Sequence, residues 1–408
     1  MDKTLYVYDA SEGTDRFIGC LDSSFIHGKE VFSFSYDPSW LESGRKDLFP
    51  EPYLFPFSGR QYAKSGTLFG IFTDSCPDRW GRTLLQRQEA LLSQKEKRLP
   101  RALNESDYLL GVNDALRMGS LRYKTSLTGP FLSNPSNESI PPLERLALLE
   151  DAAFALEEGK ENAKELHELL SPGSSLGGAR PKANVQTENG ELWIAKFPRK
   201  DDDYDQSLWE MVAYELAQRL GIEFAPSLLR KDSRYGSTFL TKRFDRDGQK
   251  RIPFVSMLAL LGKKDGESSS YLEVAEFLRT FSSDSRRDLR ELWMRILFNI
   301  AIGNTDNHLR NLGMIHGEKG WRLSPDYDAN PNPNSRHFAL PLFSEDDSLS
   351  FSLSQRLAPY LGIKKEQAKA DIDLVNTLVT SSWKKIAENV GSKAEEISLL
   401  APAFQEKK

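Results

Sequence analysis

Polar and apolar residues alternate in short runs along the first 36 residues of the chain. The runs 5–8, 17–21 and 31–36 have a period of about two, and Gly13 and Gly28 lie between them. This period is typical of strands with one buried face, and glycine is typical of the turns between strands. The pattern predicts three antiparallel strands that end at Pro38, which cannot donate to a strand ladder.

Helical spacing of apolar residues follows the predicted sheet. It indicates a helix from Pro77 to about Lys97, for which Asp74 or Ser75 could provide the cap. Residues 124–140 are dominated by Thr, Ser, Asn, Gly and Pro. Such a composition is typical of a linker, and we expect the first domain boundary there.

Strands and helices are mixed in the next 120 residues, and helices dominate the remainder. We expect one further strand at 118–123, helices at 142–158, 160–170 and 206–220, and strands at 183–185, 192–197, 228–229 and 237–240. Beyond these we expect helices at 253–261, 270–281, 284–302, 365–391 with a break, and 393–404. A block of strands with a few helices, followed by a helical half, indicates the α+β class.

Composition narrows the possible functions. The 408 residues carry a net charge of −5, so no global positive field is available to hold nucleic acid. Two cysteines cannot form a disulfide framework, and the five histidines do not have metal-ligand spacing, which disfavours a zinc enzyme. No stretch approaches eighteen apolar residues and the first residues do not resemble a signal peptide. We therefore expect a cytoplasmic protein without a membrane span.

The most informative polar cluster follows the apolar helix at 284–302. It contains Asp306, His308 and Asn311, and Asp328 lies seventeen residues beyond Asn311. Kinase catalytic loops place a base Asp and a metal-binding Asn five residues apart, with a second metal-binding Asp after a hairpin. Helix capping and turn chemistry are the plainer explanation for such residues. Asp326 is a rival for the metal-ligand role, and spacing does not choose between the two carboxylates.

Two upstream features fit the same chemistry. Gly177 and Gly178 lie in a loop that ends at Lys182, where backbone N–H groups could approach phosphate oxygens, although such a run is more often a linker. Lys196 has apolar neighbours on a predicted strand, which fits a pair with nucleotide phosphates as well as it fits an outward-facing edge lysine. Its acidic partner could be Glu210 or Glu215.

Taken together, five segments resemble the HipA family, the serine/threonine kinase toxins of bacterial type II toxin–antitoxin systems. They are 175–182, 194–198, 242–246, 303–311 and 324–328. The resemblance implies a protein-kinase-like two-lobed α+β fold. Its N-lobe would be mixed α/β with an extra N-terminal β-rich subdomain, and its C-lobe mostly α-helical. The corresponding domains are 1–125, 126–247 and 248–408.

The resemblance also assigns roles to individual residues. Asp306 would be the catalytic base, Asn311 and Asp328 would bind Mg²⁺, and the cofactors would be ATP and Mg²⁺. The implied ATP-binding residues are Gly177, Gly178, Ala179, Arg180, Pro181, Lys182, Lys196, Lys242, Arg243, Phe244, His308, Asn311, Tyr327 and Asp328. Ser175 occupies the position of the family's autophosphorylated serine, with Ser174 as the adjacent alternative.

Two positions depart from the family pattern. Arg310 stands where Lys is common, which keeps the charge but changes the donor geometry. Lys242 stands where the family can have an acidic residue, which leaves adenine contact through the backbone intact.

The resemblance finally implies partners. These are a small helix-turn-helix antitoxin of the HipB type, through which alone the chain would associate with DNA, and a translation-related protein substrate such as an aminoacyl-tRNA synthetase. Two other functions fit the same residues: a kinase-like enzyme that phosphorylates small molecules, or a degenerate kinase that acts as a corepressor or scaffold.

Overall fold

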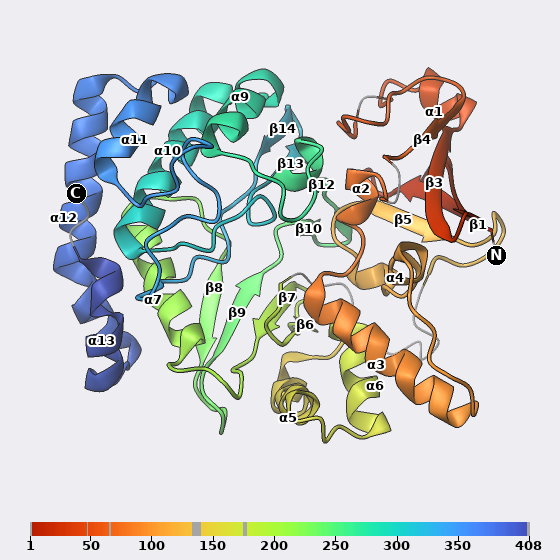
Figure 1. Ribbon diagram of the computed structural model, residues 1–408, viewed down its shortest axis with the longest axis horizontal. Helices are drawn as coiled ribbons and strands as arrows, with labels where there is room; N and C mark the ends of the chain where they lie inside the picture. Colours follow the sequence, from red (N-terminus) through yellow and green to blue (C-terminus); the bar gives the residue numbers. More distant parts are fainter. Residues whose placement is uncertain (1, 47, 65–66, 133–139, 174–177, 406–408) are drawn as a thin grey trace. The chain divides into compact units, whose positions relative to one another are not determined.

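The computed structural model describes residues 2–46, 48–64, 67–132, 140–173 and 178–405 (Figure 1). By its internal contacts the chain divides into two compact units. The first unit comprises Met1–Lys200 and Lys242–Val255, and the second comprises Asp201–Thr241 and Ser256–Lys408. Strands dominate the start of the chain and helices its second half, which confirms the α+β class.

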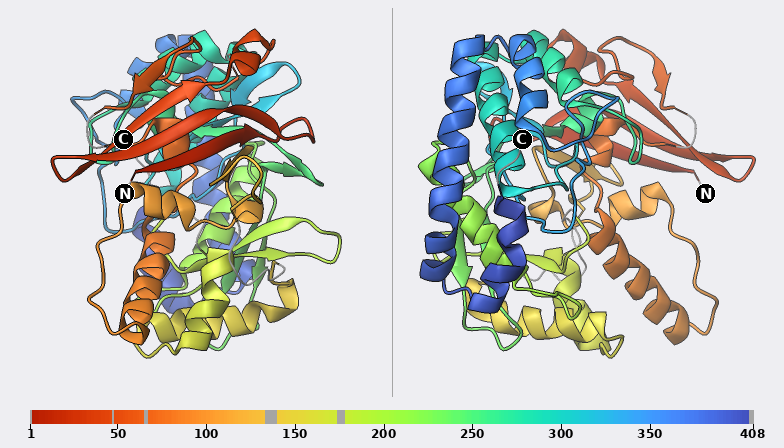
Figure 2. Two further views of the ribbon diagram at one scale, coloured as in Figure 1. Left: turned by 90° about the vertical axis from the view of Figure 1, so that its right-hand side faces the viewer. Right: turned by 60° about the vertical axis from the view of Figure 1, so that its left-hand side comes forward.

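The first unit begins with a five-stranded sheet of order β4-β3-β2-β1-β5. Its strands are β1 Lys3–Asp9, β2 Arg16–Ile26, β3 Lys29–Tyr36, β4 Arg60–Tyr62 and β5 Leu121–Lys124. Leu5, Leu21 and Phe34 are aligned across β1, β2 and β3, and all three are buried. The alternating pattern therefore predicted this meander correctly, and its long strands are seen side by side in Figure 2.

Six helices belong to the described part of the first unit. They are α1 Pro38–Glu42, α2 Gly70–Thr73, α3 Arg79–Lys95, α4 Glu105–Leu110, α5 Leu146–Glu157 and α6 Ala163–Gly173. Two short 3-10 turns, Asp114–Leu116 and Leu143–Arg145, accompany them.

The cap of α3 differs from the expectation. Asp78, and neither Asp74 nor Ser75, accepts a hydrogen bond from the Arg79 N–H at 2.7 Å. Asp74 instead ends the short helix α2, so the chain turns once more before α3 begins. The cap position was predicted wrongly because the one-turn helix α2 is too short to leave a periodic signal.

Two hairpins complete the first unit. Strands β6 Lys182–Gln186 and β7 Leu192–Lys196 pair in antiparallel register, as do the short strands β10 Arg246–Asp247 and β11 Lys250–Arg251. The first hairpin was predicted to within one residue at the ends of both strands.

Glu51 gives the first unit a specific pH dependence. Its carboxylate is buried and accepts the Ile71 N–H at 2.9 Å, at the start of α2. Burial raises the pKa of Glu51 to about 7. Because the folded pKa lies above the unfolded value, this group favours folding most below about pH 4.5, and the contribution is lost as the pH rises through 7.

We expect Glu51→Gln to remove this dependence. Between pH 5 and pH 8 the variant should gain about 3 kcal/mol of stability relative to the unaltered protein, because a neutral amide has no ionisation to oppose folding. Urea denaturation at both pH values measures the effect. Glu42→Gln, on an exposed residue, is the control. Parallel stability profiles for the Glu51 variant and the unaltered protein would contradict the prediction.

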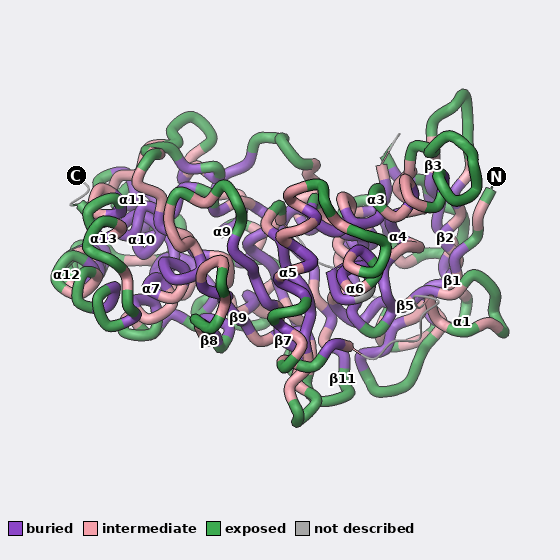
Figure 3. The backbone as a smooth tube through the Cα atoms, turned by 90° about the horizontal axis from the view of Figure 1, so that it is seen from below, coloured by how far each residue is buried: buried purple, intermediate pink, exposed green. Residues whose placement is uncertain are grey.

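The second unit is mainly helical. Its helices are α7 Gln206–Arg219, α8 Met257–Leu260, α9 Tyr271–Phe281, α10 Ser285–Ile302, α11 Phe351–Leu357, α12 Lys365–Val390 and α13 Ala394–Leu400, with 3-10 turns at Ala358–Leu361 and Ala401–Phe404. Its strands are β8 Ser227–Arg230, β9 Thr238–Lys242, β13 Gly313–Gly317 and β14 Gly320–Leu323, while β12 Phe254–Ser256 and the last residue of β9 lie at the unit bounds. In Figure 3 the backbone near α10 is largely buried, whereas α12 has exposed turns.

Three helical expectations need correction. Helix α12 is continuous over its 26 residues, without the expected break, because Val375, Val379 and Ile386 keep one buried face in phase. The helix expected at 253–261 starts only at Met257, since 254–256 form a strand. Helix α11 was not predicted, although Ser350 caps it.

None of the helices in the described ranges combines the length and the apolar composition that a membrane crossing needs.

Candidate functional site

The predicted site residues fall on both units. The glycine-rich loop, Lys196 and residues 242–244 belong to the first unit, whereas Asp306, His308, Asn311, Tyr327 and Asp328 belong to the second. Glu210 and Glu215 also belong to the second unit, so their pairing with Lys196 stays a prediction.

The described part of the glycine-rich loop runs from Gly178 to Lys182. Ser174, Ser175 and Gly177 lie outside the described residues. Gly178 has a φ of 75°, in the left-handed region that favours glycine. A Cβ atom at this position would lie 2.7 Å from Nζ of Lys182, so the ammonium group lies directly over Gly178.

Lys182 and Lys196 are directly opposite each other on β6 and β7. Opposite residues of an antiparallel pair project to the same face, and both lysines are buried, at 7% and 6% exposure. Two cationic side chains on one face, next to a glycine-rich loop, are groups of the kind that bind phosphate. This face is therefore a candidate phosphate site. The sequence had indicated the two lysines separately, whereas their pairing comes from the strand register.

The side chain of Arg243 forms hydrogen bonds within the first unit. The guanidinium donates to the carboxylate of Asp245 at 2.7 and 2.8 Å, to the Leu116 carbonyl at 2.7 Å and to Oδ1 of Asn184 at 2.8 Å. Its backbone N–H donates to the Leu192 carbonyl. Lys242 pairs with Glu191. The side chains of the predicted hinge are thus engaged within the first unit, and direct contact with a nucleotide stays a prediction.

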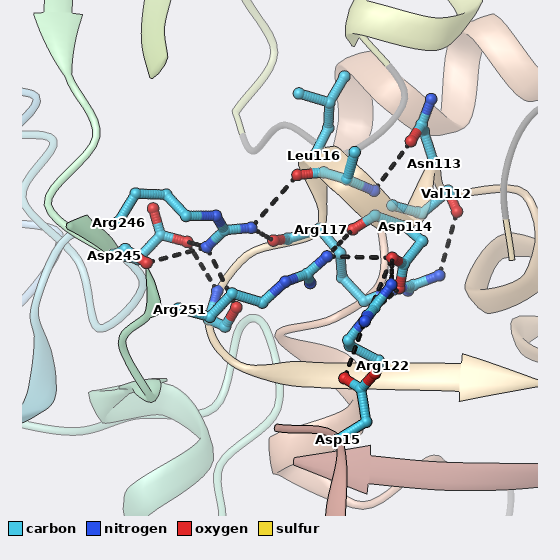
Figure 4. Close-up of polar contacts among 12 residues, drawn as sticks. Asp15, Val112, Asn113, Asp114, Leu116, Arg117, Arg122, Asp245, Arg246 and Arg251 are labelled. Atoms are coloured by element: carbon cyan, nitrogen blue, oxygen red, sulfur yellow. Dashed lines mark hydrogen bonds and ion pairs between the residues drawn. The ribbon is translucent and has the colours of Figure 1, made fainter. Parts of the chain in front are cut away.

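A buried network of arginines surrounds this segment (Figure 4). Asp245 is fully buried and also accepts the Gly119 N–H at 2.8 Å and Nη1 of Arg246 at 2.6 Å. Burial alone would raise the pKa of the Asp245 carboxyl, but Arg243 and Arg246 hold it well below its usual range. The network therefore fastens the 243–246 segment to the backbone at Gly119.

The same network extends to Asp114. Its carboxylate accepts Nη2 of Arg122 at 2.7 Å and Nη2 of Arg251 at 3.0 Å. Arg117 is fully buried without a carboxylate partner at hydrogen-bond distance among the described contacts, and its guanidinium donates to the carbonyls of Ser75, Leu109 and Val112. Burial lowers the pKa of Arg117. Only the Arg-Phe-Asp-Arg run at 243–246 pointed to this cluster before the structure was known.

In the second unit, the segment after α10 holds Asp306. Gly303 ends the helix with a φ of 66°, and a Cβ there would lie 3.0 Å from the Ala403 carbonyl oxygen, so this position is suited to glycine. Thr305 and Asn307 are buried, but Asp306 between them is exposed. A carboxylate on a fixed backbone that reaches solvent is accessible to a substrate hydroxyl.

Buried amides fix the backbone beside Asp306. The hydroxyl of Tyr271 accepts Nδ2 of Asn307 at 2.9 Å and Nδ2 of Asn299 at 3.3 Å. Asn299 in turn accepts Nδ2 of Asn304 at 2.9 Å. All four side chains are at most 3% exposed. Tyr271, at the start of α9, was not identified from the sequence, since nothing local marks it as a partner of a loop 36 residues away.

We expect Tyr271→Phe to destabilise the second unit by about 1–3 kcal/mol, because two buried amide N–H groups lose their acceptor. Equilibrium urea unfolding followed by circular dichroism measures the change. Tyr360→Phe, on a half-exposed ring, is the matched control. Equal stability of both variants would show that the amides find other acceptors.

Asn311 lies one turn beyond Asp306. Its N–H donates to the His308 carbonyl at 2.8 Å, and its amide Nδ2 approaches the Asp306 carbonyl at 3.4 Å. This places the amide oxygen on the other side, where it could serve as a metal ligand. Tyr327 supports the same loop through its hydroxyl, which donates to the Arg310 carbonyl at 2.8 Å. Arg310 itself pairs with Asp265.

The two candidate metal carboxylates have different environments. Asp326 is 2% exposed, its N–H donates to the Glu223 carbonyl at 2.7 Å, and Arg295 is 3.9 Å away. Burial raises the pKa of Asp326 to about 6. Asp328 is only partly buried, in a left-handed backbone conformation with a φ of 62°, and accepts Nδ2 of Asn330 at 3.1 Å. The geometry favours Asp328 as the accessible ligand.

The candidate ligands for a metal are Asn311 and Asp328. No group of three His, Cys, Asp or Glu residues able to hold an ion occurs among the described residues. Mg²⁺ is commonly bound by one or two protein oxygens together with substrate phosphates, so Asn311 and Asp328 fit such a site.

A comparison with protein families shows which family the chain belongs to. The sequence family described as HipA-like C-terminal domain matches residues 174–398, more than half of the chain. The chain belongs to the HipA family. The match covers the glycine-rich loop, both lysines, the hinge and the Asp306 loop, so all five segments that carried the resemblance lie inside it.

Individual relatives agree. A Haemophilus influenzae protein named "Putative kinase" is 28% identical over 144 residues, which cover 30% of this chain and 42% of that protein. "Putative kinase Y4mE" of Sinorhizobium fredii is 28% identical over 181 residues, covering 38% of this chain and 41% of that protein. The chain thus spans less than half the length of either curated relative.

A solved structure extends the likeness to the whole fold. HipA of Shewanella oneidensis, determined with HipB and its operator DNA, matches with a TM-score of 0.66. The match covers 98% of this chain and 95% of HipA, at 16% sequence identity. The HipA fold expected from the sequence is therefore confirmed, including its N-terminal region.

Proposed function

We propose that this protein is a kinase that transfers the γ-phosphoryl group of ATP to a serine or threonine of a protein. The observation that carries the proposal is the exposed carboxylate of Asp306 on a backbone fixed by buried amides, with the buried amide of Asn311 and the partly exposed Asp328 in the same unit. The buried lysines 182 and 196 support it, because they face each other on β6 and β7 beside the glycine-rich loop.

The roles follow from the chemistry of each group. Asp306 accepts the proton of the substrate hydroxyl, whose oxygen forms a bond to the γ-phosphorus while the bond to the β-phosphate oxygen breaks and ADP leaves. Mg²⁺, when bound by Asn311 and Asp328, supplies positive charge to the phosphates. Lys182, Lys196 and the backbone of 177–182 hold the phosphates.

The remaining assignments rest on family membership. Residues 242–244 would face the adenine, and His308 and Tyr327 would complete the nucleotide site. Ser175 would be the site of inhibitory autophosphorylation, in keeping with the disruptive effect of a dianion beside a phosphate-binding loop.

The biological setting is proposed from the relatives. The Shewanella structure contains HipA together with HipB and operator DNA. By analogy the chain would be a cytoplasmic toxin whose activity is inhibited by a HipB-like helix-turn-helix antitoxin. The chain would associate with DNA only through this antitoxin. Its substrate would be a translation-related protein such as an aminoacyl-tRNA synthetase, in view of the family.

Mass spectrometry after incubation with Mg-ATP tests the proposal. We expect one added phosphate on Ser174 or Ser175, and none in the Asp306→Ala variant. Absence of phosphate on the unaltered chain, together with phosphorylation of sugars or other metabolites, would favour a small-molecule kinase. Failure to bind ATP, with retention on an antitoxin–operator complex, would favour a non-catalytic scaffold.

A further inference from the structure

The first turn of α3 contacts the glycine-rich loop at several points. Oδ2 of Asp78 accepts the Gly178 N–H at 2.6 Å. The Trp80 backbone N–H donates to the Gly178 carbonyl at 2.9 Å, and its indole Nε1–H donates to the Lys182 carbonyl at 2.8 Å. Three hydrogen bonds thus join the loop to a helix that begins about a hundred residues earlier in the chain.

The start of the loop packs against the same tryptophan. A Cβ at Gly173 would lie 3.1 Å from the indole nitrogen of Trp80 and 2.6 Å from Leu84. Asn184 on β6 donates to the Pro172 carbonyl at 2.8 Å and accepts from Arg243. Helix α3 therefore touches both the approach to the loop and its exit, with the buried ring of Trp80 between them.

These contacts have a consequence for the loop's donors. In a planar trans peptide, the C=O of one residue and the N–H of the next point in opposite directions. Because the Gly178 carbonyl is directed at Trp80, the Ala179 N–H is directed away from α3. The Trp80 indole holds the Lys182 carbonyl in the same way. This fixes the backbone of Lys182, whose side-chain Nζ lies over Gly178.

We propose that Asp78 and Trp80 are positioning residues for nucleotide phosphates: they hold the glycine-rich loop by its backbone, so that the Ala179 N–H and the Lys182 ammonium are presented in a fixed arrangement. The inference rests on the proposed function in one respect, that residues 178–182 contact phosphates. It assigns the region before residue 125 a part in the nucleotide site.

Nucleotide binding to the full chain tests the consequence. Trp80→Phe keeps a buried aromatic ring but lacks the indole donor, so we expect ATP to bind about 5-fold more weakly, the usual effect of one hydrogen bond, with adenosine binding unchanged. Asp78→Ala should act in the same direction, and so should Asp78→Asn, because its single amide oxygen cannot accept both the Arg79 N–H and the Gly178 N–H. Trp40→Phe, on a buried tryptophan of α1, is the control.

Amide hydrogen exchange at Gly178, measured without nucleotide, tests the hydrogen bond from Gly178 to Asp78 itself. We expect faster exchange in both Asp78→Ala and Asp78→Asn than in the unaltered protein, because neither variant offers Gly178 its carboxylate oxygen while keeping the cap. Unchanged exchange at Gly178 would show that Asp78 does not hold the loop. Tighter ATP binding in Asp78→Ala would contradict the positioning role, because it would mean that the carboxylate competes with phosphate. An unaltered protein that binds neither ATP nor adenosine would refute the proposed function, while the exchange experiment still decides whether Asp78 holds the loop.

Discussion

Asp306→Ala is expected to lower phosphotransfer by about 10³-fold, within the range usual for loss of a positioned general base. The folded structure should persist, because the Asp306 side chain is exposed and the neighbouring loop is held by Asn307 and Tyr271. Transfer of radiolabelled phosphate from ATP, with binding of ATP measured separately, gives the comparison. We expect the ATP dissociation constant to change little, since the carboxylate acts on the acceptor hydroxyl.

Two comparisons make this result specific. Asp232→Asn alters an exposed acid of the same unit and should leave transfer unchanged. Asp306→Asn keeps the size of the side chain but cannot accept the proton, and should be as inactive as the alanine variant. Transfer within a few-fold of the unaltered rate in either Asp306 variant would remove the carboxylate from its proposed role.

Asp245→Asn is expected to destabilise the first unit by about 3–5 kcal/mol, because Arg243 and Arg246 would be left buried without their counter-ion. The carboxylate is fully buried and also holds the Gly119 N–H, so the loss should loosen the connection between that backbone and the hinge. Chemical denaturation followed by tryptophan fluorescence measures the change in the free energy of unfolding.

Asp247→Asn is the control for this prediction. The residue is exposed and only two positions away. Its variant should unfold within about 0.5 kcal/mol of the unaltered protein, as is usual for surface substitutions. A similarly small effect at Asp245 would show that the backbone carbonyls around Arg243 and Arg246 are sufficient to hold both guanidiniums.

Local patterns accounted for most of the secondary structure. The meander of β1–β3, the hairpin of β6 and β7, and helices α7, α9 and α10 follow from periods of 2 and 3.6 residues, since each depends on neighbours close in sequence. The one-turn helix α2 and the strand β12 were missed, because three or four residues are too few to show a period.

The motif order identified the candidate chemistry but left its geometry open. Asp306, Asn311 and Lys196 could be selected from spacing and resemblance alone. Whether Asp326 or Asp328 is accessible depends on the backbone of Glu223 and on Arg295, which approach from other parts of the second unit. Burial is a property of the folded chain, and two acids of equal chemistry differ only through it.

The contacts that hold the site together come from tertiary structure. Trp80 and Asp78 on Gly178, Tyr271 on Asn307, and Gly119 on Asp245 each join residues that are remote in sequence. No periodicity or local propensity encodes such a pair, because each partner is an ordinary helix, turn or loop residue in its own segment. They become specific partners only when the packing of the apolar faces brings the segments together.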